Sequence, residues 1–279
     1  MPRKISAVII DTYGNKKLPT LAIEKTLECN RIGKIYTFSD TPYFDGAEFV
    51  RIPKITSIKE YEKWVLGGML DFVKEDFLII QWDGFVLQPS KWNEEFESYD
   101  YIGAPHTYDS NSFQVGNGGF SYRSLKLMNA IAEVQSSEGI PKVGLPEDIL
   151  ICHEYRIALE KKGVQFAPVE LASQFSFQQE GLPVDFGNLF GFHSPWNFPR
   201  FFTEDFMLSI VGDVIERMTN FRVFIVYLEE CRMRGMNQLF SESIQSVDKY
   251  PNIIEIINQS LSNKAEQYWA ERLKKVMSG

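Results

Sequence analysis

The sequence predicts an α/β fold in which a mostly parallel sheet is flanked by helices and is followed by a helical C-terminal extension. Two observations support this class. Over about the first 80 residues, short β-branched apolar runs alternate with longer segments of helical periodicity, which is the pattern of βαβ units. From Thr203 onward the apolar residues keep helical spacing. We therefore expect two domains, residues 1–202 and residues 203–279.

The elements of the sheet domain are expected in the order β-α-β-β-α-β. Ile5–Ile10 is a continuous apolar run, which is typical of a parallel strand that is buried on both faces. The segment 59–74 carries apolar residues at i, i+3 and i+4 spacing, which predicts a helix. The full expected order is strand 5–10, helix 18–29, strand 34–38, strand 48–52, helix 59–74 and strand 77–80.

The second half of the chain is expected to contain loops and then helices. Glycine and proline predict loops at 103–106, 116–119 and 146–148, a helix is expected over 149–161, and 165–202 has loop and strand character. Thr203 is a suitable N-cap for the first helix of the extension. That helix has an apolar stripe, and helical periodicity returns further on: Met207, Ile210, Val211, Val214, Ile215 and Met218, then 221–233, 250–261 and 265–277.

Composition excludes several classes of protein. The chain has 279 residues with 29 basic and 37 acidic side chains, a formal net charge of −8, so a globally basic surface for nucleic acid is not expected. Cys29, Cys152 and Cys231 form no CxxC pair and are interpreted as free thiols in a reducing compartment. No stretch approaches the roughly 20 apolar residues of a membrane span, and the first apolar run is too short for a signal peptide. We expect a soluble cytoplasmic protein.

Polar residues follow three of the expected strands. In open parallel sheets, ligands bind beyond the carboxyl ends of the strands, so we expect these residues to meet in one crevice and to bind substrate. They are Asp11, Thr12 and Tyr13 after the first strand, Ser39 and Asp40 after the second, and Gln81, Trp82 and Asp83 after the fourth.

Two of the loops carry residue types that suit ligand binding. Asp83 leaves the end of a buried strand, where a carboxylate can hold a divalent cation; alternatively it is a turn residue beside Gly84. The segment Gly116-Asn117-Gly118-Gly119 allows the backbone to approach a ligand and donate N–H groups to it. The alternative for this segment is a tight turn or a bulge.

Two later segments offer acid–base and metal-binding groups. Glu147 and Asp148 follow Pro146 at an expected helix start, where a carboxylate can act as a general base or simply cap the helix. His193 lies in an aromatic stretch and is either a structural residue or a metal ligand together with Asp83. The sequence contains no GxxxxGK[ST], GxGxxG, HExxH or GxSxG motif.

These segments occur in the order QWDG, GNGGFSYR, PEDILICHEY and FGFH. In this order the chain resembles the GT-A class of nucleotide-sugar glycosyltransferases over about residues 4–202. It is similar to uncharacterised bacterial GT-A-like domains with a Q-x-D…GNGGFS-x-R…PED…F-x-x-H signature, and the order also resembles that of inverting β-1,4-galactosyltransferases. The resemblance implies a GT-A-like, Rossmann-like sheet and leaves the helical extension unexplained.

The resemblance also implies roles for individual residues. Asp83 matches the last Asp of a D-x-D motif and, with His193, would bind Mn²⁺ or Mg²⁺, while Gln81 stands where the first Asp would be. Asp148 matches the base that deprotonates the acceptor hydroxyl, and Glu147 would orient the acceptor or share that role. The remaining matches bind substrate: Asn117, Gly118 and Gly119 beside the donor sugar, and Asp11, Thr12 and Tyr13 where uridine is held.

The implied reaction is transfer of a hexose from a nucleoside diphosphate sugar, a UDP-sugar, to a glycan or lipid-linked glycan acceptor in bacterial surface polysaccharide or glycoconjugate synthesis. One base and one displacement step would invert the anomeric centre; retention stays an open alternative. A binding module without turnover and a nucleotide-sugar pyrophosphorylase are the other hypotheses, although the DTYGNKK loop has few glycines for the latter. The extension is expected to serve packing or homodimer formation, with at most peripheral membrane contact.

Overall fold

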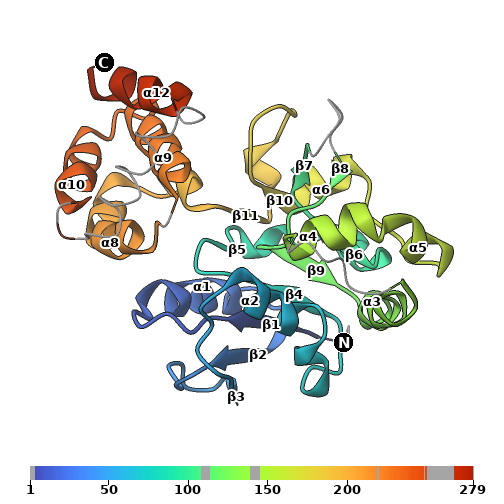
Figure 1. Ribbon diagram of the computed structural model, residues 1–279. Coiled ribbons are helices and arrows are strands. Elements are labelled where there is room, and N and C mark those ends of the chain that lie inside the picture. The colour runs from blue at the N-terminus through green and yellow to red at the C-terminus, as the bar shows by residue number, and fades with distance from the viewer. Residues whose placement is uncertain are drawn as a thin grey trace. The chain divides into compact units, whose positions relative to one another are not determined.

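The computed structural model of the chain describes residues 4–107, 114–138, 145–218, 220–247, 249 and 267–278 (Figure 1). Its contacts divide the chain into two compact units, Met1–His193 and Ser194–Gly279. The first unit is an α/β structure and the second is helical, which confirms the predicted fold class and the helical C-terminal part. The division follows His193, whereas the sequence analysis sets the boundary after residue 202.

The first unit is built on a six-stranded sheet with the strand order β3-β2-β1-β4-β9-β6. These strands are β1 (Ile5–Ile10), β2 (Ile32–Ser39), β3 (Glu48–Arg51), β4 (Phe77–Ile79), β6 (Tyr101–Gly103) and β9 (Ser121–Arg123). Strand β1 pairs in parallel with β2 and β4, and β2 pairs in parallel with β3. Only β9 among the described strands of this sheet runs the other way, antiparallel to β4 and β6.

This topology decides which loops meet. The carboxyl ends of β1, β2 and β4 lie at one edge of the sheet because these strands are parallel. Strand β9 is antiparallel to β4, with Ser121 opposite Ile79, so the start of β9 lies at the same edge. The segment 116–119 before β9, called the glycine segment below, is therefore placed beside the turn that follows β4.

Helices complete the first unit around the sheet (Figure 1). They are α1 (Lys17–Leu27), α2 (Ile58–Val65), α3 (Leu125–Glu138), α4 (Glu147–Ile149), α5 (Arg156–Lys161) and α6 (Val169–Phe175). Helix α1 contacts β2, α2 contacts β1, and α3 packs against α5. All six residues of β1 are buried, as expected for a strand that is covered on both faces.

Two small sheets extend the first unit. Strand β5 (Gly84–Val86) pairs antiparallel with β11 (Gly191–His193), which in turn pairs with β10 (Ser176–Phe177). Strands β7 (Pro105–His106) and β8 (Gln114–Val115) form the other pair. The register of β5 and β11 sets His193 opposite Gly84, so the end of this unit lies against the turn after β4.

The prediction of one helix over 59–74 is wrong. Helix α2 ends at Val65, and a 3-10 helix follows at Gly68–Asp71. The two elements are separated by Gly67, whose φ of −173° is extended rather than helical. Glycine is a poor helix former, so the pair Gly67-Gly68 ends the helix although the apolar spacing continues past it.

The middle of the chain is more regular than predicted. The sequence analysis did not expect helix α3, and helix α6 lies in a region predicted as loop and strand. The helix predicted over 149–161 starts earlier, at Glu147, and is interrupted by a π-helical turn at Leu150–Glu154 before α5. Single π turns of this kind are frequent at functional sites.

The second unit contains α7 (Phe198–Phe201), α8 (Glu204–Arg217), α9 (Phe221–Met233), α10 (Asn237–Val247) and α12 (Gln267–Ser278). Helix α10 packs against α8 and α9, and α12 packs against α9. The prediction for α8 is confirmed: Thr203 is its N-cap, and its predicted apolar stripe is buried. Helix α10 was not predicted, and the helix expected at 250–261 lies outside the described residues.

Two expectations from composition can be compared with the structure. Cys29, Cys152 and Cys231 are free, as the sequence analysis expects, and all three are buried. Among the helices that the structure describes, none is both long and apolar enough to cross a membrane.

Candidate functional site

The ends of β1 and β2 are joined by a lysine that the sequence analysis did not single out. Lys16 Nζ donates to the Asp11 carbonyl oxygen at 2.8 Å and to Ser39 Oγ at 3.1 Å, and it lies 3.3 Å from Asp11 Oδ1. It is also 3.9 Å from Asp40 Oδ1. The ends of β1 and β2 are therefore joined, and the Lys16 ammonium group links the two carboxylates that follow these strands.

The neighbours of Asp11 have different environments. The Tyr13 N–H donates to Asp11 Oδ1 at 2.9 Å, and the Tyr13 side chain is 38% exposed. Thr12 is buried, and its Oγ1 accepts a hydrogen bond from the Ile55 N–H at 2.8 Å. The described contact of the Thr12 hydroxyl thus ties the first strand end to the chain after β3.

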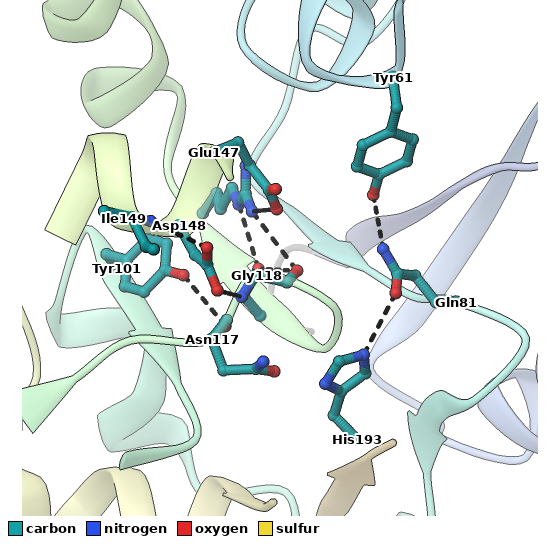
Figure 2. A network of polar contacts seen from close by, with 11 residues as sticks. Tyr61, Gln81, Tyr101, Asn117, Gly118, Glu147, Asp148, Ile149 and His193 are labelled. Atoms are coloured by element: carbon teal, nitrogen blue, oxygen red, sulfur yellow. Dashed lines mark hydrogen bonds and ion pairs between the residues drawn. The ribbon is translucent and has the colours of Figure 1, made fainter. Parts of the chain in front are cut away.

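The turn after β4 holds a chain of side-chain hydrogen bonds, shown in Figure 2. Gln81 Nε2 donates to the Tyr61 hydroxyl at 2.7 Å, and Gln81 Oε1 lies 3.2 Å from His193 Nε2. The same His193 nitrogen is 3.9 Å from Asp83 Oδ1. Gln81, Asp83 and His193 are therefore brought together as predicted. Trp82, between them in sequence, is half-buried.

The glycines next to this turn leave room for the imidazole ring. A Cβ added at Gly119 would lie 2.1 Å from His193 Nε2, and one at Gly84 would lie 2.8 Å from His193 Cδ2. Carbon atoms in contact sit about 3.5–4.0 Å apart, so neither position accommodates a side chain with His193 in place. Space for the ring is a physical reason for these glycines that sequence spacing does not reveal.

The glycine segment also meets the acidic pair. The Gly118 N–H donates to Asp148 Oδ2 at 3.2 Å, while Asp148 Oδ1 accepts from the Ile149 N–H at 2.9 Å (Figure 2). A Cβ at Gly118 would lie 2.0 Å from Glu147 Oε1. The structure thus packs both acids against the segment, and Asp148 is half-buried whereas Glu147 is buried.

A fully buried arginine holds this arrangement. The Arg123 side chain is 0% exposed, and its Nη2 lies 3.2 Å from Glu147 Oε1 and 3.4 Å from the Gly118 carbonyl oxygen. Its Nε donates to Ser121 Oγ at 3.1 Å. Burial raises the pKa of Glu147 to about 7, with a further increase from the charge of Asp148 and an opposing effect of Arg123. The Glu147 carboxyl group is therefore buried and paired with Arg123.

Asn117 completes the loop with an unusual backbone. Its φ is +53°, in the left-handed region that asparagine tolerates better than most residues, and its carbonyl oxygen accepts from the Tyr101 hydroxyl at 3.1 Å. His106 is near the acidic pair: burial lowers its pKa, and the charges of Asp148 and His193 also act on it. Both residues border the same group of side chains.

The donor atoms near His193 suit a divalent cation. Asp83 Oδ1 lies 3.9 Å from His193 Nε2, and the Gln81 amide oxygen lies 3.2 Å from the same nitrogen. Divalent cations accept such oxygen and nitrogen ligands. Among the described residues there is no group of three or more His, Cys, Asp or Glu side chains for a metal. The three residues fit a cation that takes its other ligands from a substrate.

Four residues of the site were not identified from the sequence. Tyr61 lies in the segment 59–74, whose apolar spacing indicates only a helix, and Arg123 lies in the GNGGFSYR segment without an assigned role. Lys16 directly precedes α1 and His106 lies in β7, and neither belongs to a motif in the sequence. The available signal was weak: only the position of Arg123, four residues after Gly119, marked it for attention.

The chain belongs to the family described as "Protein of unknown function (DUF5672)", whose model matches residues 47–193. No curated protein matches the chain. The matched residues include Tyr61, the turn after β4, the glycine segment, the acidic pair and His193. The family description states no activity.

Several solved structures are similar at low identity. One is the bifunctional IspDF from Campylobacter jejuni, with a TM-score of 0.37 and 10% identity over 59% of this chain and 48% of that chain. Another is a glycosyltransferase involved in the glycosylation of the major capsid of PBCV-1, with a TM-score of 0.43 and 11% identity over 67% and 92%. A third is 4-diphosphocytidyl-2C-methyl-D-erythritolsynthase from Anaerococcus prevotii DSM 20548, at 0.38 and 10% over 59% and 86%. This chain thus spans about half the length of the first of them.

Proposed function

We propose that the chain is a glycosyltransferase of the GT-A type that transfers a hexose from a UDP-sugar to a hydroxyl group of a glycan or lipid-linked glycan. The observation that carries the proposal is the position of two different groups on either side of one glycine dipeptide. Asp148 accepts from the N–H of Gly118, and His193, with Asp83 and Gln81, lies against Gly119. A base and a set of ligands for a cation are thereby adjacent.

Asp148 is the proposed base of the reaction. A sugar hydroxyl is a poor nucleophile, so a carboxylate must take its proton as the new glycosidic bond forms. In the same step the bond between the anomeric carbon and the diphosphate oxygen breaks, and the electron pair leaves with UDP. A single displacement of this kind inverts the anomeric centre. Asp148 suits the role better than Glu147 because Arg123 engages the Glu147 carboxylate.

Asp83, His193 and the Gln81 amide oxygen are the proposed ligands of a divalent cation, Mn²⁺ or Mg²⁺. When bound there, a cation would neutralise charge on the diphosphate leaving group. The chain's own residues contribute in other ways. The N–H groups of the glycine segment can donate to substrate oxygen atoms, and Lys16 holds Asp11 and Asp40 at the edge proposed for the nucleotide.

The proposal is tested by a donor screen with the purified chain. Thermal shift and release of the leaving nucleotide (UDP, GDP or CMP) are measured with UDP-, GDP- and CMP-sugars, with and without Mn²⁺. We expect stabilisation by one UDP-sugar and slow release of UDP. Absence of a shift with every nucleotide would refute the donor site.

A pair of variants separates binding from chemistry. Asp148→Asn should retain the thermal shift with the donor and lower the transfer rate by about 10²–10⁴-fold, the usual contribution of a general base. Asp185→Asn is the matched control, because Asp185 caps a separate 3-10 helix at Phe186–Asn188, and it should leave the rate unchanged. Equal activity of the Asp148 variant and the wild type would rule out Asp148 as the base.

A binding module without turnover is the second candidate. The neutral Gln81 at the end of β4 favours it, because an amide contributes no charge to a cation site. In that case the donor screen would give a thermal shift without release of UDP, in the presence or absence of Mn²⁺.

A further inference from the structure

Both the nitrogen and the oxygen of the Gln81 side-chain amide make polar contacts. Its Nε2 donates to the Tyr61 hydroxyl at 2.7 Å, and its Oε1 faces His193 Nε2 at 3.2 Å (Figure 2). We infer that Tyr61 is a positioning residue that turns the Gln81 carbonyl oxygen toward His193 and Asp83, and thereby makes a neutral amide serve as a ligand for a divalent cation. This inference rests on the cation site of the proposed function.

The orientation of an amide matters for this role. A carboxylate has two equivalent oxygen atoms, and either can bind a cation. An amide has one acceptor end and one donor end, and its NH₂ group cannot bind a cation. A glutamine at this position therefore needs a partner that accepts a hydrogen bond from its NH₂ group, and Tyr61 is that partner.

Tyr61 is suited to accept this hydrogen bond. Its hydroxyl oxygen carries two lone pairs and one hydrogen, so it can accept from the Gln81 NH₂ group while its own hydrogen points elsewhere. The distance of 2.7 Å between Gln81 Nε2 and the Tyr61 oxygen is that of a hydrogen bond.

The backbone fixes both partners of this bond. Tyr61 lies on α2, which begins at the N-cap Ser57, whose side chain accepts from the Glu60 N–H. Gln81 exchanges two backbone hydrogen bonds with Gly84, at 2.8 and 3.1 Å. Neither residue needs to move for the amide to face His193. Rigid support of a ligand by a neighbouring hydrogen bond is a common means of setting metal affinity.

A cycle of four proteins tests the inference: the wild type, Tyr61→Phe, Gln81→Glu and the double variant. Binding of Mn²⁺ in the presence of UDP is measured from the electron paramagnetic resonance signal of free Mn²⁺, which does not depend on activity. Tyr61→Phe should weaken Mn²⁺ binding by about tenfold or more. In the Gln81→Glu background, the same change should alter binding by less than about twofold, because a carboxylate needs no orientation.

Tyr36→Phe is the matched control, because the described hydrogen bond of the Tyr36 hydroxyl is to Lys34 on β2. It should leave Mn²⁺ binding unchanged. Wild-type affinity in Tyr61→Phe would overturn the inference, and so would an equal loss in both backgrounds, which indicates a general structural effect. Failure of the wild type to bind Mn²⁺ would also overturn it, whereas the proposed transferase activity is judged separately, by release of UDP from the donor.

Discussion

Replacing Gly119 by alanine tests whether the glycine segment exists to accommodate the ring of His193. The new Cβ would lie 2.1 Å from Nε2, 2.4 Å from Cδ2 and 2.7 Å from Cε1 of that ring. Carbon contacts are about 3.5–4.0 Å, so the imidazole has to move by more than about 1 Å. The φ of Gly119 is not positive, so alanine meets no backbone strain and the effect is confined to the ring.

The expected loss of stability follows from two contributions. Insertion of a methyl group into packed surroundings costs about 1–3 kcal/mol. The bond of 3.2 Å between His193 and Gln81 is lost when the ring moves, which costs about 0.5–1.5 kcal/mol more. We therefore expect Gly119→Ala to lower the free energy of unfolding by about 1.5–4.5 kcal/mol.

Urea denaturation of Gly119→Ala, His193→Ala and the double variant measures this effect. Because removal of the ring removes the clash, the double variant should be as stable as His193→Ala alone. Gly14→Ala is the control, since a Cβ there would meet nothing within 4 Å. The reasoning is refuted if Gly119→Ala keeps wild-type stability, or if its loss is the same with and without the His193 ring.

Three further predictions concern ionisation, a buried charge and a helix cap. The pKa of Glu147 is raised to about 7 from a usual value of 4.5, so its contribution to stability is present below pH 4.5 and is lost as the pH rises through 7. Urea denaturation at pH 5 and pH 7.5 should therefore show that the stability difference between wild type and Glu147→Gln shifts in favour of the variant at the higher pH. A difference that stays constant with pH would contradict this. Arg123→Met leaves the buried Glu147 carboxylate without its partner, so the free energy of unfolding should fall by about 3–5 kcal/mol. Part of this lost stability should return when Glu147→Gln is added. If none returns, the two side chains are not coupled. Thr203→Ala removes the hydroxyl that accepts from the Phe206 N–H, and calorimetry should show a loss of about 1 kcal/mol, while an unchanged unfolding temperature would show that this cap contributes nothing.

Much of the sheet was predictable because local sequence decides where buried strands start and stop. Both ends of the strand Ile5–Ile10 were predicted correctly, and the strands predicted at 34–38, 48–52 and 77–80 lie within two residues of their observed bounds. Continuous β-branched runs between polar turns leave few alternatives. The helix over 59–74 was not predicted correctly, because the apolar spacing continues beyond Gly67 although the helical backbone conformation ends before it.

The convergence of the strand ends was also predictable, because parallel strands place their carboxyl ends at one edge. Lys16 joins the ends of β1 and β2 by its contacts with Asp11 and Asp40, as that rule implies. Gln81 and Asp83 instead meet His193, which ends β11 in another sheet. The rule identifies the edge of the sheet but not the partners, since Lys16 is one of many lysines in the sequence.

The sequence by itself determined the fold class, the helical C-terminal part and the segments that form the candidate site. Only the tertiary structure decided which side chains touch. Tyr61 is an ordinary aromatic residue of a helix in the sequence, and it became the partner of Gln81 through the packing of α2 beside β1. Likewise, Gly118 and Gly119 are small because Glu147 and His193 occupy the space beside them. Contacts between residues far apart in the chain depend on distances in space, and a single sequence carries no record of those distances.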